Sequence, residues 1–240
     1  MCWEGPGPGV RGRALALVVS ARAALPATRS EKRLPPGGDR TIRIRCLGEE
    51  RMSEASTDHG KVVVNRAMSL DGFIAAAGHV MDWGGGRQLR DFVGPDEFHE
   101  VAAATGAMLV GRRTSDVGDR MQAEEPGSVD YPFSGPVFVL THRPPQSPPP
   151  GVTYLSGDIA EAVATARRAA GAKNVEILGA DVAGQCLRRG LVDEILVYVM
   201  PVLLGEGIPF SAPGMPRIDL EPLGSARSGA VTILRFRPRS

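Results

Sequence analysis

Short apolar runs alternate with helix-like stretches along most of this sequence, and that alternation restricts the possible folds more than any other feature. The runs lie at residues 62–64, 107–110, 136–140 and 175–178, and each ends in glycine or polar side chains. Apolar runs of this length, bounded by turn residues, are typical of buried strands. Strands that are separated by helices predict an α/β domain whose sheet is mostly parallel.

The C-terminal part of the sequence departs from this alternation. Residues 195–204 form the longest apolar stretch, and the segments 217–226 and 230–237 predict an antiparallel hairpin that turns near Ser228 and Gly229. We therefore expect an α/β protein with three layers, a mixed, mostly parallel central sheet and an antiparallel C-terminal hairpin. The predicted domain spans residues 58–240.

Three helices can be bounded from their terminal residues. A helix that begins at Pro95 places Asp96 in its first turn, where an acidic side chain suits the helix dipole. Asp158 and Glu161 form a capping-box pattern for a helix over residues 158–170. A third helix is expected over residues 182–189, with Asp181 as a plain N-cap in one interpretation. Residues 116–132 are polar, and we expect them to be irregular.

Residues 1–57 differ from the rest of the chain in composition. They are rich in Gly, Pro, Arg and Ala, and they show no sustained periodicity. We interpret them either as a disordered N-terminal extension, which has too little apolar surface to fold, or as a mis-assigned start, with the true start at Met52 and residues 1–51 upstream of it. The apolar segment at residues 14–19 imitates a signal peptide, but it is short and its flanks fit poorly.

Composition excludes several classes of function. The net charge is +1 and aromatic residues make up 5% of the chain, which gives no basis for a nucleic-acid-binding surface. Cys2, Cys46 and Cys186 are scattered, so neither a zinc site nor a disulfide framework is predicted. No apolar run approaches the ~20 residues that span a bilayer. We expect a cytoplasmic protein without a metal, a nucleic-acid partner or a membrane contact.

Polar and basic residues follow three of the predicted strands. Residues 111–114 (Gly-Arg-Arg-Thr) and 141–143 (Thr-His-Arg) supply hydroxyl and guanidinium groups, and residues 179–181 (Gly-Ala-Asp) open a helix. Free N–H groups at a helix N-terminus and arginine side chains both bind phosphates. Together the three junctions suit the pyrophosphate and ribose phosphate of a cofactor. The Gly-Arg-Arg-Thr junction alone is explained equally well as a solvated helix start, and His142 alone is more often a surface residue than a ligand.

The first strand runs into a polar turn, Ser69-Leu70-Asp71-Gly72, and a glycine-rich loop at residues 78–86 follows. Asp71 has two interpretations: it orients a substrate or helps to protonate it, or it forms the turn by a hydrogen bond to its own backbone. The loop is either a flexible connector or a mobile flap whose Trp83 covers a ligand.

These motifs occur together, and in this order, in a known family. The set comprises Ser-Leu-Asp-Gly at 69–72, the three strand junctions, Leu-Val-Asp-Glu at 191–194, and Pro-Val-Leu-Leu-Gly-Glu-Gly at 201–207. Over about residues 61–237 the chain resembles the dihydrofolate-reductase-like family that includes the reductase domain of riboflavin biosynthesis. The resemblance implies the dihydrofolate reductase fold, NADPH as the hydride donor, a small-molecule substrate and a homodimer.

The resemblance also assigns residues to parts of a site. It implies that the adenosine phosphate end is bound by Gly111, Arg112, Arg113, Thr114, Thr141, His142 and Arg143. It implies that the pyrophosphate meets Gly179, Ala180, Asp181 and Val182, and that Ala67 and Ile74 flank the nicotinamide. It places Ser69, Asp71 and Trp83 on the substrate side, with Asp71 as the catalytic candidate. Asp96, in the first turn of its helix, is a second candidate carboxylate for the substrate, or a partner of the helix dipole.

Three departures from the family pattern bear on the substrate. Leu178-Gly179 stands where the family often has Gly-Gly, and Ile177 stands where the riboflavin reductases carry a Glu that faces the substrate. The zinc signature of the deaminase half does not occur in this sequence. The expected activity resembles that of 5-amino-6-(5-phosphoribosylamino)uracil reductase. The alternatives are a reductase of the same fold that acts on a pterin or another imine, and a non-catalytic NADPH-binding module.

Overall fold

The protein is described from a computed structural model. The description covers residues 60–79, 89–124, 131–149 and 151–239. The predictions made for residues 1–57 and for Trp83 lie outside these ranges.

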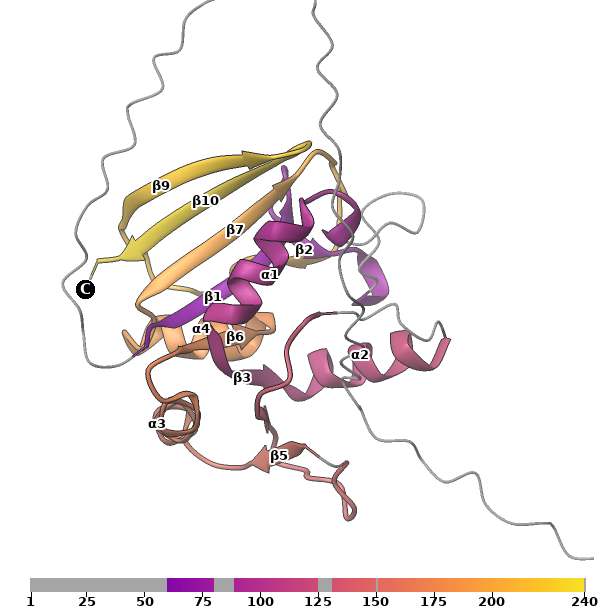
Figure 1. Cartoon of the computed structure of the whole chain (residues 1–240), viewed down its shortest axis with the longest axis vertical. Helices are drawn as coiled ribbons and strands as arrows, with labels where there is room; N and C mark the ends of the chain where they lie inside the picture. The colour runs from indigo at the N-terminus through magenta and orange to yellow at the C-terminus, as the bar shows by residue number, and fades with distance from the viewer. Residues whose placement is uncertain (1–59, 80–88, 125–130, 150, 240) are drawn as a thin grey trace, which may run out of the picture. The chain divides into compact units, whose positions relative to one another are not determined.

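The secondary structure follows the expected alternation of strands and helices (Figure 1). The strands are β1 (Val62–Ser69), β2 (Phe73–Ala75), β3 (Thr105–Gly111), β4 (Val137–Leu140), β5 (Val152–Leu155), β6 (Asn174–Leu178), β7 (Glu194–Met200), β8 (Ile208–Pro209), β9 (Leu220–Ser228) and β10 (Val231–Pro238). The helices are α1 (Pro95–Ala104), α2 (Arg112–Glu124), α3 (Ile159–Ala170) and α4 (Ala180–Arg188), with 3-10 turns at Ala77–His79 and Leu89–Asp91.

In the described residues, the main sheet has eight strands in the order β5-β4-β3-β6-β1-β7-β10-β9. Neighbouring strands from β5 to β7 are parallel, whereas β10 runs antiparallel to both β7 and β9. β2 and β8 form a separate antiparallel pair. In Figure 1, α1 lies in front of the sheet and α4 behind it. The predictions of a mixed, mostly parallel sheet and of a C-terminal hairpin are confirmed.

The core lies on both faces of the sheet, so the central strand β1 is buried on both sides. Val62 and Val64 pack with the apolar residues of α3 and α4, whereas Val63 packs on the opposite face, where α1 contributes Phe98 and Val101. Successive side chains of a strand point to opposite faces, so an uninterrupted valine run is what a doubly covered central strand requires.

Local sequence signals explain where the helices begin. Asp158 is the N-cap of α3, and its carboxylate accepts a hydrogen bond from the Ala160 amide at 2.7 Å. α1 begins at Pro95, as predicted. The prediction that residues 116–132 are irregular is wrong up to Glu124, because α2 continues to that residue. Most side chains of α2 are polar and Val117 is its buried residue, so little apolar periodicity marks this helix in the sequence.

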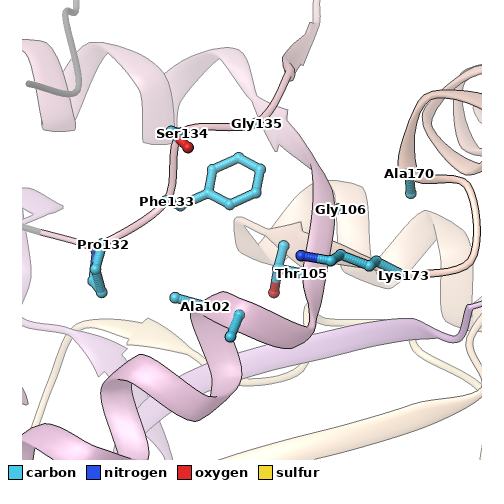
Figure 2. A pocket seen from close by; sticks show the side chains of 10 residues that line it. Ala102, Thr105, Gly106, Pro132, Phe133, Ser134, Gly135, Ala170 and Lys173 are labelled. Carbon is cyan, nitrogen blue, oxygen red and sulfur yellow. The ribbon is translucent and has the colours of Figure 1, made fainter. Parts of the chain in front are cut away.

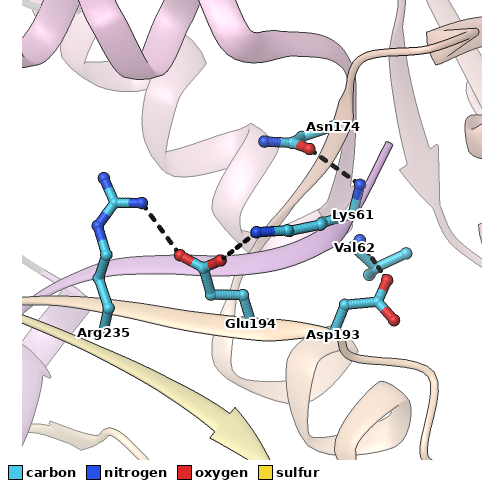
Figure 3. Close-up of polar contacts among 6 residues, drawn as sticks. All are labelled: Lys61, Val62, Asn174, Asp193, Glu194 and Arg235. Carbon is cyan, nitrogen blue, oxygen red and sulfur yellow. Dashed lines mark hydrogen bonds and ion pairs between the residues drawn. The ribbon is translucent and has the colours of Figure 1, made fainter. Parts of the chain in front are cut away.

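Charged residues join three strands near the start of β7. The side chain of Glu194 is buried, and its carboxylate contacts Lys61 Nζ at 3.2 Å and Arg235 at 3.1 Å (Figure 3). The neighbouring Asp193 accepts a hydrogen bond from the Val62 amide at 2.7 Å. These contacts fix the ends of β1, β7 and β10 against one another, and they give the Leu-Val-Asp-Glu motif a structural role.

A buried carboxylate also lies within the sheet. Glu176 of β6 is fully buried, and Asn65 Nδ2 and Tyr131 OH donate to it at 2.9 and 3.0 Å. Thr105 Oγ1 lies 3.2 Å from the same group. Burial raises the pKa of Glu176 to about 7, although these hydrogen bonds act in the opposite direction.

We predict that Glu176 makes the protein less stable as the pH rises from about 4.5 to about 7. The unfolded carboxyl has a pKa near 4.5 and the folded one a pKa of about 7, so the folded state keeps its proton over a range in which the unfolded state loses it. The free energy of unfolding should therefore fall by up to about 3 kcal/mol across that range. Urea unfolding of the wild type and of Glu176→Gln, which cannot titrate, measures the effect. Equal pH slopes for the two proteins would contradict it.

Candidate functional site

The predicted site residues come together because their strands are neighbours in the sheet. β4, β3, β6 and β1 lie side by side and parallel, so their carboxyl ends open at one edge. The register pairs Gly111 with Leu140 and Val110 with Leu178. The three polar junctions and the Ser-Leu-Asp-Gly turn therefore occupy the edge where parallel sheets bind ligands.

The turn after β1 is held by side chains rather than by backbone alone. Ser69 is fully buried, and its hydroxyl donates to the Asp71 carboxylate at 2.6 Å while it accepts from the Phe73 amide at 2.9 Å. Gly72 has a φ of 93°, which glycine adopts without a side-chain clash. The sequence signal for a turn at Asp71-Gly72 is therefore confirmed.

Asp71 connects this turn to a distant loop. Its two carboxylate oxygens accept hydrogen bonds from the amides of Leu204 at 3.1 Å and Gly205 at 2.7 Å. The hydrogen bond from Ser69, and then those from Gly205 and Leu204, lower the pKa of Asp71 below its ordinary value. Asp71 is thus an exposed, ionised carboxylate at neutral pH, and its main backbone partners lie in the Pro-Val-Leu-Leu-Gly motif rather than in its own turn.

The ends of β3, β4 and β5 form a basic cluster. Arg112 pairs with Asp116 at 2.7 Å, lies 3.5 Å from the carbonyl oxygen of Arg143, and stacks over the ring of Tyr154 at 5.8 Å. Thr141 Oγ1 accepts a hydrogen bond from the Arg143 amide at 3.1 Å. The structure thus brings the Gly-Arg-Arg-Thr and Thr-His-Arg segments together. Arg113 and His142 are exposed beside them.

Tyr154 is a residue of this cluster that could not be singled out from the sequence. It lies on β5, and the register places it opposite Val139 of β4. The available signal was an aromatic residue near the end of the strand after the Thr-His-Arg segment. The sequence could not show that this strand, β5, lies next to β4 in the sheet.

Two helix N-termini meet at the ends of β3 and β6. Gly179 has a φ of 97°, and a Cβ atom there would lie 2.6 Å from Thr114 Oγ1. A Cβ on Gly111 would lie 3.1 Å from a methyl group of Val182. Only glycine allows the first turns of α2 and α4 to approach so closely. No side chain caps α4, so its first backbone N–H groups remain available to an anion.

The prediction that Asp181 acts as an N-cap is wrong. α4 begins at Ala180 with Gly179 as its N-cap, and Asp181 lies inside the first turn, where it accepts a hydrogen bond from Gln185 at 2.8 Å. Its carboxylate is exposed. An acidic residue before an apolar run suggests an N-cap. In the structure, however, Gly179 takes the non-helical N-cap conformation, so the helix begins at Ala180, one residue before Asp181.

The remaining predicted residues occupy the same part of the fold. Ala67 lies near the carboxyl end of β1 on the face that α1 covers, and Ile74 is half-buried in β2. Asp96 is exposed in the first turn of α1. α1 leads directly into the start of β3, so its own first turn faces the carboxyl end of the sheet.

A separate pocket lies at the opposite end of β3. Its cavity has a volume of ≈ 360 Å³, and its lining includes Thr105, Phe133 and Lys173 (Figure 2). None of the predicted site residues lines it. The site predicted from the sequence is instead an open edge built from turns and helix N-termini.

Comparison with known proteins assigns the chain to a family. Residues 60–234 match the family model of the RibD C-terminal domain. The chain belongs to this family. The riboflavin biosynthesis protein RibD of Corynebacterium ammoniagenes is 30% identical over 156 residues, which are 61% of this chain and 44% of that protein. The match therefore spans less than half the length of that relative.

Solved structures share the fold of this RibD C-terminal domain. A putative riboflavin biosynthesis protein from Shewanella sp. PV-4 has a TM-score of 0.61 at 24% identity, over 75% of this chain and 99% of that one. Dihydrofolate reductase from Enterococcus faecalis, complexed with NADP(H), has a TM-score of 0.51 at 16% identity, over 76% and 98%. The predicted dihydrofolate-reductase-like fold is confirmed. None of the helices in the described ranges is long and apolar enough to span a bilayer.

The residues present fit a dinucleotide phosphate. Gly111 and Gly179 let the first turns of α2 and α4 pack closely together, and no side chain caps the first backbone N–H groups of α4. Arg112, Arg143 and Thr141 add guanidinium and hydroxyl donors within the neighbouring cluster. Backbone N–H groups and arginine forks are the donors that phosphate oxygens prefer.

We predict that Gly179→Ala destabilises this domain more than a positive φ alone explains. The new methyl group would meet Thr114 Oγ1 in addition to adopting an unfavourable φ, whereas a methyl group on Gly171, which has a φ of 62°, would have no atom within 4 Å. Gly171→Ala is therefore the matched control for backbone strain. Unfolding in urea should show an additional loss of about 1–3 kcal/mol for Gly179→Ala. Equal losses would show that α2 and α4 can move apart.

Proposed function

We propose that this chain is an NADPH-dependent reductase that transfers a hydride to a small heterocyclic or imine substrate. The proposed substrate resembles 5-amino-6-(5-phosphoribosylamino)uracil, because the chain resembles the reductases that act on this compound. The observation that carries the proposal is the uncapped N-terminus of α4, packed at Gly179 against the start of α2, together with the adjacent arginine cluster. Membership of the RibD C-terminal family supports a reductase.

Residues at different positions along the sheet edge would bind different parts of the cofactor. The N-terminus of α4 would hold the diphosphate, and Arg113, Arg143 and Thr141 would bind the adenosine phosphate. Arg112 is already paired with Asp116, so its guanidinium contributes less free charge. Ala67 and Ile74 would flank the nicotinamide, which supplies the hydride when the cofactor is bound.

Asp71 would orient the substrate rather than donate a proton. Both carboxylate oxygens already accept hydrogen bonds. Because its pKa is lowered, Asp71 carries no proton at neutral pH that it could donate as a general acid. Its negative charge, fixed beside the Leu204–Gly205 loop, can still attract a donor group of the substrate. Ser69 would act by holding this carboxylate, and Asp96 would border the same space from α1.

A homodimer is also part of this proposal. β9 is an edge strand of the main sheet, and Leu220 and Leu223 on it are exposed. An exposed strand edge with apolar side chains is a surface that a second subunit can cover.

The cofactor assignment is tested by binding and turnover. We expect the full chain to bind NADPH more tightly than NADH, and to consume NADPH when 5-amino-6-(5-phosphoribosylamino)uracil is added. Arg143→Met should weaken NADPH binding by about tenfold and change NADH binding little, because NADH lacks the extra phosphate. Arg168→Met removes an exposed arginine of α3 and is the control. Tight NADPH binding without turnover on pyrimidine or pterin candidates would favour a binding module instead.

The role of Asp71 is tested by two substitutions. Asp71→Asn removes the charge, and Ser69→Ala removes the hydrogen bond from Ser69 while the charge remains. If the charge orients the substrate, Asp71→Asn should lower kcat/KM by about tenfold or more, and Ser69→Ala by clearly less. Steady-state kinetics at saturating NADPH measures both. Full turnover by Asp71→Asn would remove Asp71 from the catalytic residues and leave it as a turn former.

A further inference from the structure

Arg66 is a buried arginine whose position the family resemblance did not assign. It lies on β1 with 7% of its surface exposed, and the Nε atom has no hydrogen-bond partner. Among the residues that the structure describes, no carboxylate forms an ion pair with it. Burial lowers the pKa of Arg66 to about 10, so the guanidinium is still charged at neutral pH.

The guanidinium of Arg66 is held by two carbonyl groups from distant segments. One terminal nitrogen donates to the carbonyl oxygen of Gly179, and the other donates to that of Phe210 at 3.0 Å. The group also stacks over the Phe210 ring, with its carbon 5.4 Å from the ring centre. The flat, forked shape of a guanidinium allows one side chain to hold two acceptors in a fixed relation.

The two carbonyl groups belong to opposite halves of the site. Gly179 is the N-cap of α4, where the diphosphate would bind. Phe210 follows β8, and its amide donates to the Gly72 carbonyl oxygen at 2.8 Å, inside the Ser-Leu-Asp-Gly turn. β8 in turn pairs with β2, which carries Ile74. A single buried side chain therefore links the cofactor side of the sheet edge to the substrate side.

This arrangement is unusual in energetic terms. A buried charge without an opposite charge destabilises a fold, because desolvation is not offset by an ion pair. Cys186, the nearby thiol, does not supply the missing charge, since burial raises its pKa to about 12. The methionine or leucine that would fill the same space at no electrostatic cost cannot bridge Gly179 and Phe210.

We propose that Arg66 is a positioning residue that couples the two halves of the site, so that filling the Gly179 turn orders the turn at Asp71. The proposal rests on the function proposed above for its ligands. The chain of contacts runs from Gly179 through the guanidinium to Phe210, and from the Phe210 amide to Gly72. An anion at the N-terminus of α4 also adds the negative charge that the buried guanidinium lacks, which strengthens the link when the cofactor is present.

The coupling is tested with Arg66→Met and Arg66→Lys. Methionine preserves an unbranched apolar stem, and lysine preserves the charge but cannot hold both carbonyl groups in a fork. Arg188→Met, an exposed arginine of α4 that contacts Met215, is the control. NADP⁺ cannot donate a hydride, so it allows the affinity for 5-amino-6-(5-phosphoribosylamino)uracil to be measured with and without the dinucleotide.

In the wild type and in Arg188→Met, NADP⁺ should tighten substrate binding by about tenfold. In both Arg66 variants this ratio should fall to about one, even where each ligand still binds alone. A side chain that only stabilises the fold would weaken both ligands and leave their ratio unchanged. Recovery of the ratio by Arg66→Lys would show that charge, rather than the bridge, is responsible, and would overturn the proposal.

Amide hydrogen exchange tests the bridge without any ligand. Loss of the guanidinium should speed exchange at the Phe210 and Ala183 amides, which donate to Gly72 and Gly179, and leave the Gly171 amide at the end of α3 unchanged. Unchanged exchange at Phe210 in both variants would refute the link. If the wild type binds no NADPH or NADP⁺, the proposed function fails, whereas the exchange result still decides whether Arg66 joins the two segments.

Discussion

The burial of β1 on both faces is the constraint on which the rest of the structure depends. This strand pairs with β6 on one side and β7 on the other, and its valines enter both halves of the core. A strand in this position cannot slip by one residue, because a shift would exchange the side chains of the two faces. The register of β1 therefore fixes where Ser69 and Asp71 emerge relative to Gly179 and Gly111.

The same constraint places two buried polar residues next to each other on β1. Asn65 points to one face and donates to the buried Glu176, and Arg66 points to the other face and donates to Gly179 and Phe210. Each polar residue interrupts an otherwise apolar strand at the level where the neighbouring strand β6 ends. Before that level, β1 itself contributes only the apolar side chains of Val62, Val63 and Val64 to the core. From that level to its end, β1 carries Arg66 and Ser69, whose side chains hold the Gly179 and Asp71 turns.

The sequence was enough to predict the strands of the main sheet, their order along the chain and most of the turns after them, because apolar runs, glycine and Asp-Gly carry those signals locally. It did not predict the short strand β8. It was not enough for α2, in which Val117 is the buried residue and polar side chains cover the rest. It also missed Tyr154 and Arg66. Tyr154 matters only because β5 lies beside β4, and Arg66 matters only because β8 returns to β2. Contacts between segments that are distant in the sequence leave no local pattern.

The hydrogen bonds around Asp71 indicate that this residue would act by its position and charge and not as a proton donor. A carboxylate that accepts hydrogen bonds from Ser69, Leu204 and Gly205 has little capacity left to hold a proton, so its value to a reductase lies in a fixed negative charge. Hydride transfer requires the donor and acceptor carbons to be held close together, and that is a matter of position rather than of acid strength. Asp71 holds the Leu204–Gly205 loop, and Arg66 joins Phe210 to Gly179 at the start of α4, where the proposed function places a cofactor phosphate. If the proposed function holds, residues that join the turns would therefore influence hydride transfer even where they are too far from the reacting atoms to touch them.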